Sequence, residues 1–236
     1  MLAAATSGRR LEQDAAGGWW FERWASSRRV VAGITDRRLS ASELLAAVVP
    51  TTTVEAEQVH DGAIAMIERR RDAAQWIPGC DALLTSLSGV ALLIRTADCL
   101  PIFFSDPSRG VVGLAHVGWR GLAAQLPMRM VAAFRHLYRS GPAELRIAIG
   151  PSIRACCYEV DSEFAARFGS HVRQHGGRRT CDLIGVAIDQ LRRSGVRADR
   201  ILDAERCTAC EPQHWFSLRR EGAATGRLTS VIMLRP

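Results

Sequence analysis

Three residues that lie far apart in the chain carry side chains that bind transition metals. His60 ends the segment EAEQVH, Cys99 lies in RTADCLP and His116 lies in GLAHVGWRG. Zinc binds imidazole nitrogen and thiolate sulfur, and catalytic zinc sites use three protein ligands so that the fourth position stays open for water or substrate. We therefore interpret His60, Cys99 and His116 as the ligands of a catalytic metal site.

The spacing of these residues differs from that of a structural zinc site. Structural sites close all four positions with ligands that are paired a few residues apart. Here 38 residues separate His60 from Cys99, and 16 residues separate Cys99 from His116. Only a completed fold can bring such residues together.

The residues beside the ligands indicate where strands end. Asp98 precedes Cys99 and Pro101 follows it, so we expect the thiol in a polar turn, although a free cysteine is most often a small buried hydrophobe. After His116 the sequence Gly-Trp-Arg-Gly allows close approach of a ligand at its glycines and begins a helix. Because a helix N-terminus attracts anions, Arg120 is a candidate anion-binding residue.

A second cysteine pattern forms only half of a metal motif. Cys207 and Cys210 make a CxxC pair with His214 nearby, but no second CxxC or CxxH pair completes a zinc knuckle. We interpret the adjacent Cys156 and Cys157 as small packing residues, since neighbouring cysteines rarely bond to each other.

The composition excludes several kinds of chemistry. The chain contains no lysine, so it has no phosphate-loop lysine, no Schiff base and no Ser-Lys pair. All 31 basic residues are arginine, and despite a formal net charge of +7 they are dispersed among acidic residues. We therefore do not expect nucleic acid as a partner.

The N-terminal sequence and the cysteines favour a cytoplasmic protein. The segment MLAAATSGRRLEQD turns polar after five residues, too soon for the apolar core of a secretory signal. No stretch reaches the roughly 20 apolar residues of a membrane span. Because the chain has seven cysteines, an odd number, we expect reduced thiols and a cytoplasmic location, without a membrane partner.

The pattern of apolar residues predicts an α+β fold of layered sheets and helices. Several strands are apolar on both faces and must lie between layers. Strands are expected at residues 30–34, 54–60, 89–96, 101–105, 111–117, 145–150, 200–204, 215–219 and 229–234. Helices are expected at residues 40–48, 121–139, 161–168 and 181–193. We expect residues 29–236 to form one catalytic domain and residues 1–28 an irregular N-terminal arm.

Five segments of the chain resemble the YfiH/DUF152 laccase-domain family, whose members are known as purine nucleoside phosphorylases and formerly as polyphenol oxidases. The resemblance covers residues 54–236, and TADCLP and AHxGWRG are its specific motifs. The matching segments are QVH (58–60), GCDALLTSLSGVALLIRTADCLPIFF (79–104), GLAHVGWRGLAA (113–124), AIGPSIRACCYEV (148–160) and CTACEPQHWFSLRREGAATGR (207–227).

The resemblance implies a layered α/β/β/α sandwich of mixed sheets with flanking helices. It also implies that a zinc ion held by His60, Cys99 and His116 is responsible for the activity, with copper as an alternative metal. The implied reactions are phosphorolysis of adenosine, inosine and methylthioadenosine, together with adenosine deamination. The partners are then a purine nucleoside and phosphate, and we expect the enzyme to be a monomer.

Further site residues are expected from the chemistry of phosphorolysis. Arginine suits phosphate because its planar guanidinium binds oxyanions at two points. We interpret Asp98 as a general base or as a group that orients a ligand, and a turn-capping carboxylate is the structural alternative. Besides Arg120, the candidates for the phosphate or substrate site are Arg37, Arg219, Arg220 and Arg227.

The N-terminal part departs from the family pattern. Residues 34–40 lack the Gly-Gly turn and the Leu-Asn-Leu stretch of the family, and Arg37 takes the place of the family arginine. We therefore expect this wall of the pocket, and with it the substrate preference, to differ.

Two rival functions follow from the same residues. Cys99 and His116 could act as the nucleophile and base of a cysteine hydrolase or amidase. A copper-loaded polyphenol oxidase is the other alternative. A multicopper centre needs many imidazoles, and the chain has only six histidines, of which four lie in unrelated segments: His136, His171, His175 and His214.

Overall fold

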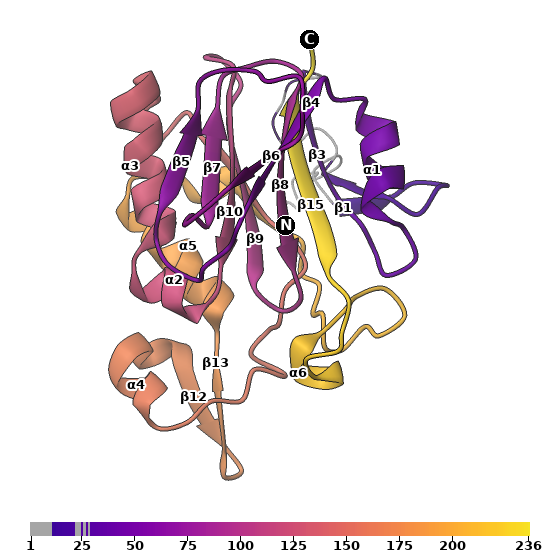
Figure 1. Cartoon of the computed structure of the whole chain (residues 1–236). Coiled ribbons are helices and arrows are strands. Elements are labelled where there is room, and N and C mark those ends of the chain that lie inside the picture. The colour runs from indigo at the N-terminus through magenta and orange to yellow at the C-terminus, as the bar shows by residue number, and fades with distance from the viewer. Residues whose placement is uncertain (1–10, 22–24, 26, 28) are drawn as a thin grey trace, which may run out of the picture.

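Two β-sheets packed face to face form the centre of the protein in the computed structural model (Figure 1). The structure describes residues 11–21, 25, 27 and 29–236. Among these residues, seven strands form the first sheet, in the spatial order β1 (Leu11–Gln13), β2 (Trp19–Phe21), β3 (Val30–Ile34), β15 (Leu228–Leu234), β8 (Val90–Thr96), β4 (Thr52–Ala56) and β6 (Gln75–Ile77). Strand β4 runs parallel to both of its neighbours, and the other pairs are antiparallel.

A second mixed sheet lies against the first. In the described part of the chain its six strands are, in spatial order, β14 (Ile201–Asp203), β11 (Arg146–Ile149), β9 (Leu100–Asp106), β10 (Val111–Val117), β7 (Ala82–Thr85) and β5 (Ile64–Ile67). The two outermost pairs are parallel and the inner pairs antiparallel. Every residue of the central strands β9 and β10 is buried, as expected for strands covered on both faces.

Helices cover the outer face of each sheet (Figure 1). The six-stranded sheet is covered by α2 (Trp119–Ala123), α3 (Leu126–Tyr138) and α5 (Leu183–Arg193), whereas α1 (Ala41–Val48) packs on the seven-stranded sheet. Apolar side chains of both sheets, among them Leu92, Phe103 and Ile232, fill the space between the sheets. The predicted α/β/β/α sandwich is therefore confirmed.

Helix α1 begins at the serine that the sequence indicates. The Ser40 hydroxyl accepts a hydrogen bond from the backbone N–H of Glu43, whose carboxylate accepts one from the backbone N–H of Ser40. This capping box satisfies two N–H groups at the helix start. The buried side chains Leu44 and Val48 then attach the helix to the sheet.

The single helix predicted at residues 121–139 is two helices, so that prediction is wrong in this detail. Helix α2 ends at Ala123 and α3 begins at Leu126. Between them Gln125 adopts a left-handed φ of 57°, and Pro127 lies in the first turn of α3, where its missing N–H costs nothing. The short α2 therefore forms a separate turn directly after β10.

A small lobe projects from the end of the sandwich (Figure 1). It contains α4 (Glu163–Phe168), a 3-10 turn at Gly169–His171 and the hairpin of β12 (Val172–His175) and β13 (Arg178–Cys181). The sequence predicts the helix but not the hairpin. A further 3-10 turn, Ala198–Arg200, precedes β14.

Two other predictions need correction. Residues 215–219 are not a strand, because Ser217 caps the short helix α6 (Leu218–Glu221) by accepting a hydrogen bond from the N–H of Arg220. The expected irregular arm contains β1 and β2, which extend the seven-stranded sheet. Trp19 anchors this segment, since its ring lies 5.0 Å from the buried ring of Trp215. Residues 1–10 of the expected arm lie outside the described residues.

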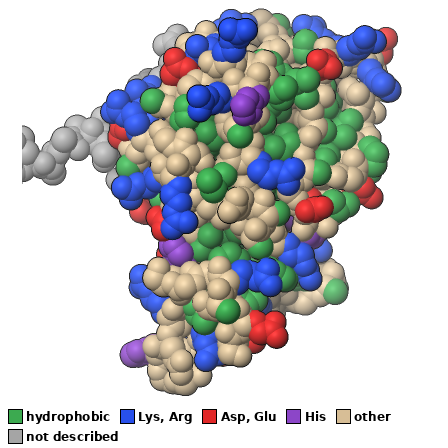
Figure 2. Space-filling view, turned by 90° about the vertical axis from the view of Figure 1, so that its left-hand side faces the viewer, with side chains coloured by type: hydrophobic (Ala, Val, Ile, Leu, Met, Phe, Trp, Pro, Cys, Tyr) green, Lys and Arg blue, Asp and Glu red, His purple; other side chains and the backbone are tan. Residues whose placement is uncertain are grey.

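Charged side chains are scattered over the helical layer that carries α3 and α5. Figure 2 shows arginines on this face interspersed with acidic and apolar side chains, without one continuous basic patch. No helix among the described residues is long and apolar enough to span a membrane.

Candidate metal centre and its pocket

The three predicted ligands meet at one end of the two sheets. His60 follows β4, Cys99 lies in the turn between β8 and β9, and His116 lies near the end of β10. Their ligand atoms all lie within 4.8 Å of one another, and the two imidazole rings are perpendicular at 89° with centroids 4.6 Å apart. His116 is buried, Cys99 half-buried and His60 exposed, so the set opens to solvent on one side.

The buried carboxylate of Asp81 holds both histidines. One of its oxygens accepts hydrogen bonds from Nδ1 of His116 at 2.8 Å and from the backbone N–H of His60 at 2.9 Å. The other oxygen accepts from the backbone N–H of Asp61 at 2.7 Å. Burial raises the pKa of Asp81, but these donors outweigh it and lower the pKa below its usual range. The carboxylate is therefore charged, and Nε2 of His116 is left to face the thiol and a metal.

The turn before β9 is held by a second carboxylate. Asp98 has a left-handed φ of 88°, and its side chain accepts hydrogen bonds from the hydroxyl of Thr208 at 2.6 Å and from the backbone N–H of Arg219 at 2.7 Å. Both of its oxygens are thus engaged with the C-terminal loops. The contacts match the structural alternative for Asp98, a carboxylate that fixes a turn.

The surroundings of Cys99 and His116 favour the charged form of each of these two side chains. Burial raises the pKa of Cys99, but hydrogen bonds from His116 and His60 outweigh it and lower the pKa to about 6. Burial lowers the pKa of His116, but its bonds to Asp81 and Cys99 outweigh it and raise the pKa to about 9. At neutral pH the sulfur is therefore a thiolate, the form that binds metals.

The donor set and the space around it fit a metal ion such as zinc. Two imidazoles and one thiolate are the three-ligand pattern of a catalytic zinc site. Gly118 borders the set, and a Cβ at this position would lie 3.1 Å from Sγ of Cys99 and 3.6 Å from Cδ2 of His60. The glycine therefore keeps the approach to the thiolate free.

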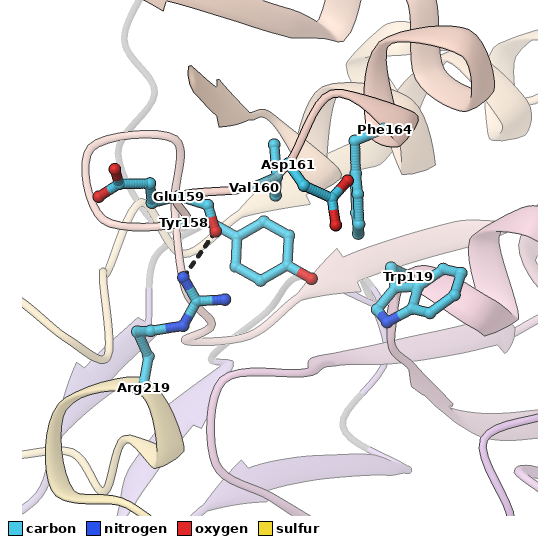
Figure 3. Close-up of a pocket in the computed structure, with 7 residues that line it drawn as sticks. All are labelled: Trp119, Tyr158, Glu159, Val160, Asp161, Phe164 and Arg219. Carbon is cyan, nitrogen blue, oxygen red and sulfur yellow. Dashed lines mark hydrogen bonds between the residues drawn. The ribbon is translucent and has the colours of Figure 1, made fainter. Parts of the chain in front are cut away.

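A pocket of about 350 Å³ opens from this centre. Loops and helix starts form its walls. The lining residues are His60, Ala97, Asp98, Cys99, Gly118, Trp119, Arg120, Ile153, Tyr158, Leu183, Leu218 and Arg219. A wider cavity of about 690 Å³ adjoins it and shares Trp119, Tyr158 and Arg219. Figure 3 shows the ring of Tyr158 lying between Arg219 on one side and Trp119 on the other.

Two of the predicted arginines line this pocket. The guanidinium of Arg120 stacks 4.5 Å from the centre of the Trp119 ring, and that of Arg219 stacks 5.0 Å from the centre of the Tyr158 ring. Arg219 also donates a hydrogen bond to the backbone carbonyl of Glu159 at 2.7 Å. Among the described residues, neither guanidinium forms an ion pair with a carboxylate, so both keep charge available for an anion.

The other three predicted arginines lie outside the lining of this pocket and bind the protein itself. Arg37 donates to the carbonyl of Pro212 and pairs with Glu221. Arg220 donates to the carbonyls of three residues of the C-terminal loop, and Arg227 donates to two adjacent carbonyls. Their positions indicate structural roles.

Sequence reasoning missed Asp81 and the aromatic wall. Asp81 precedes a short apolar strand in GCDALLT, a pattern that also fits an ordinary turn. Tyr158 and Trp119 come from segments 39 positions apart in the chain that meet only in the fold. The one signal in the sequence that could have indicated Asp81 is a charged residue directly before a buried strand.

Replacing Asp81 with asparagine should weaken metal binding by roughly 10–100-fold, because the charge that orients His116 is lost. Competition with a chromophoric chelator measures the affinity. Asp106→Asn is the matched control, since Asp106 is equally buried but lies at the far end of β9. Equal affinity in the two variants would contradict the role of Asp81.

Metal-free protein should be alkylated at Cys99 with a pH midpoint near 6, because the thiolate forms above the lowered pKa. Peptide mapping after brief iodoacetamide treatment identifies the residue, and metal-loaded protein should be protected. A midpoint near 9 would show an ordinary thiol and overturn the described electrostatics.

Comparison with known proteins places the chain in a family. Residues 32–235 match the family model described as multi-copper polyphenol oxidoreductase laccase. The chain is 36% identical to the purine nucleoside phosphorylase YlmD of Geobacillus stearothermophilus over 75% of this chain and 70% of the relative. It is 33% identical to adenosine deaminase RL5, from an unknown prokaryotic organism, over 72% of this chain and 70% of the relative.

Solved structures agree with this match. The crystal structure of YlmD from G. stearothermophilus has a TM-score of 0.87 at 30% identity, covering 96% of this chain and 99% of that one. The crystal structure of the hypothetical protein YfiH from Bacillus licheniformis has a TM-score of 0.85 at 26% identity, covering 95% and 99%. The chain therefore belongs to the multi-copper polyphenol oxidoreductase laccase family, the laccase-domain family that its motifs indicate.

Proposed function

We propose that the protein is a metal-dependent purine nucleoside phosphorylase whose centre is His60, Cys99 and His116. The observation on which the proposal rests is that His60 and Cys99 line one pocket with Arg120 and Arg219, two arginines that form no ion pair with a carboxylate among the described residues. Phosphorolysis needs groups that hold an oxyanion beside the nucleoside, and a metal ion next to them can stabilise the charge that develops. The names of the relatives, phosphorylases and one deaminase, support the substrate class.

Phosphorolysis exchanges one bond at the sugar for another. An oxygen of phosphate bonds to C1′ of the nucleoside, the bond from C1′ to the purine nitrogen breaks, and the purine leaves with the bonding electrons and takes up a proton. Arg120 and Arg219 would hold the phosphate by charge-assisted hydrogen bonds. The barrier falls because the reacting atoms are held together and the developing charge is stabilised.

The aromatic wall of the pocket suits a purine. Trp119 and Tyr158 line both the inner and the outer cavity, and Phe164 lies 5.4 Å from the Trp119 ring in the outer one. The inner cavity falls within the range of volumes, roughly 300–1,000 Å³, that small-molecule sites occupy. A flat base can therefore pack against aromatic surface while the sugar points toward the metal donors.

A zinc ion held by the three donors would supply a Lewis acid with one open position. Asp81 would keep His116 oriented, and the exposed His60 would face the substrate side. Asp98 would act as a positioning residue, since both of its oxygens already accept hydrogen bonds from loop groups.

Other activities remain as measurable alternatives. Adenosine deamination would release ammonia without consuming phosphate, and one relative has the name adenosine deaminase. A cysteine hydrolase using Cys99 as nucleophile would work without metal. The copper alternative has support only from the family description, and the described residues place two imidazoles, not many, at the centre.

Substituting Cys99 with alanine should abolish both metal binding at the centre and phosphate-dependent release of free purine base, while the far-UV spectrum stays unchanged. Metal content and base release from adenosine and inosine are measured side by side. Cys181→Ala is the control, because Cys181 is a buried thiol outside the pocket lining. Phosphate-dependent turnover that survives in Cys99→Ala would refute the proposal.

Substituting Arg120 with alanine should raise the KM for phosphate by roughly 10–100-fold, which is the loss of one charged hydrogen-bond partner. The KM for the nucleoside should change much less. Arg135→Ala removes the same charge from the exposed side of α3 and serves as the control. A phosphate KM that equals that of the control would move the anion site away from Arg120.

A further inference from the structure

Four cysteines outside the pocket lining converge at one point of the surface. Cys156 and Cys157 lie in the loop between β11 and α4, and Cys207 and Cys210 lie in the loop between β14 and α6. All four sulfur atoms lie within 4.8 Å of one another, and all are free thiols. The sequence predicts packing roles for Cys156 and Cys157, whereas the structure leaves Cys156 exposed and Cys157 half-buried, both beside the CxxC pair of Cys207 and Cys210.

The spacing of the sulfur atoms fits one tetrahedral metal ion. The Sγ of Cys210 lies 3.5 Å from that of Cys156 and 3.3 Å from that of Cys157, and Cys156 lies 3.6 Å from Cys207. Four sulfurs at the Zn–S distance of about 2.3 Å from one ion are about 3.8 Å apart, by the geometry of a tetrahedron. An iron–sulfur cube would need its four thiolates spread around several metal atoms.

The backbone around Cys207 is shaped for a thiolate. Backbone N–H groups of Arg154, Ala209 and Cys210 donate hydrogen bonds to its sulfur. Two of these donors belong to the CxxC turn itself. The guanidinium of Arg220 donates to the carbonyls of Thr208 and Ala209, which holds this turn in place.

The adjacent pair can reach the same ion because its loop turns sharply. The N–H groups of Cys157 and Tyr158 both donate to the carbonyl of Arg154 at 2.9 Å. The two loops are also bound to each other, since Ser152 and Cys207 form a parallel bridge and Arg154 makes two hydrogen bonds to the carboxylate of Asp203. The cluster is thus a preorganised feature of the fold.

We propose that Cys156, Cys157, Cys207 and Cys210 bind a structural zinc ion that joins the two loops. Four thiolates close all four positions, so this ion has no open position for chemistry. It differs in this from the centre at His60, Cys99 and His116, and the proposal does not depend on the proposed function.

The zinc would fasten two walls of the pocket to each other. The first loop contributes Ile153 and Tyr158 to the pocket, and the second leads directly into Leu218 and Arg219. Removing the ion should therefore lower the melting temperature and raise the KM for the nucleoside, while His60, Cys99 and His116 stay in place.

Metal analysis of the full-length protein, purified under reducing conditions, tests the proposal. Wild type and Cys181→Ala should contain two equivalents of zinc, and Cys99→Ala and Cys210→Ser should each contain one. Cys210→His should restore the second equivalent, because imidazole can replace thiolate. Wild-type protein with one equivalent that persists in Cys210→Ser would overturn the proposal.

A second measurement avoids any variant of the cluster that fails to fold. Cys99→Ala loaded with cobalt should show intense sulfur-to-metal charge transfer and the visible bands of a tetrahedral ion with four thiolates. Absence of these bands would refute the site. A disulfide would instead lower the mass of the protein by two hydrogens. Its cysteines would then react with an alkylating reagent only after treatment with a reductant, and not after treatment with a metal chelator, and this result would also overturn the proposal.

Discussion

The buried carboxylate of Asp81 is the interaction on which the geometry of the centre depends. It binds the imidazole of His116 from one strand and the backbone N–H groups of His60 and Asp61 from another segment. His60 has a left-handed φ of 62°, a conformation that costs energy for a residue with a Cβ and persists only when its surroundings impose it. One charged group thereby fixes an exposed histidine, a buried histidine and the strained turn between β4 and β5.

The sandwich explains why such a carboxylate can remain charged in the interior. Strands β7, β9 and β10 are buried on both faces, so their ends are held with little freedom. Asp81 lies directly before β7, His116 near the end of β10, and Cys99 directly before β9. A fixed set of donors around a charge costs less reorganisation than mobile water would, and this favours the thiolate and the imidazolium described above.

Much of the fold, and the positions of Cys99 and His116 at strand ends, could be predicted because the local sequence indicates where the strands end. Apolar runs with polar turns marked β8, β9 and β10, and their ends marked Cys99 and His116. Interactions between distant segments left no local trace. The hairpin β12–β13 has the polar sequence VRQHGGRRTC, which is typical of a loop. Cys156 lies beside Cys210 only because two distant loops meet in the fold. Asp81 was missed for the same reason, since its partners lie in other elements.

The donors and the walls of the pocket come from different kinds of structure. His116 and the neighbours of Cys99 belong to strands that form the common scaffold, whereas Tyr158, Leu218 and Arg219 lie on connecting loops or at a helix start. Loops tolerate insertions and substitutions better than buried strands. Evolution can therefore exchange the surfaces that select a substrate without rebuilding the reactive centre, which gives one inherited scaffold a route to several different chemistries.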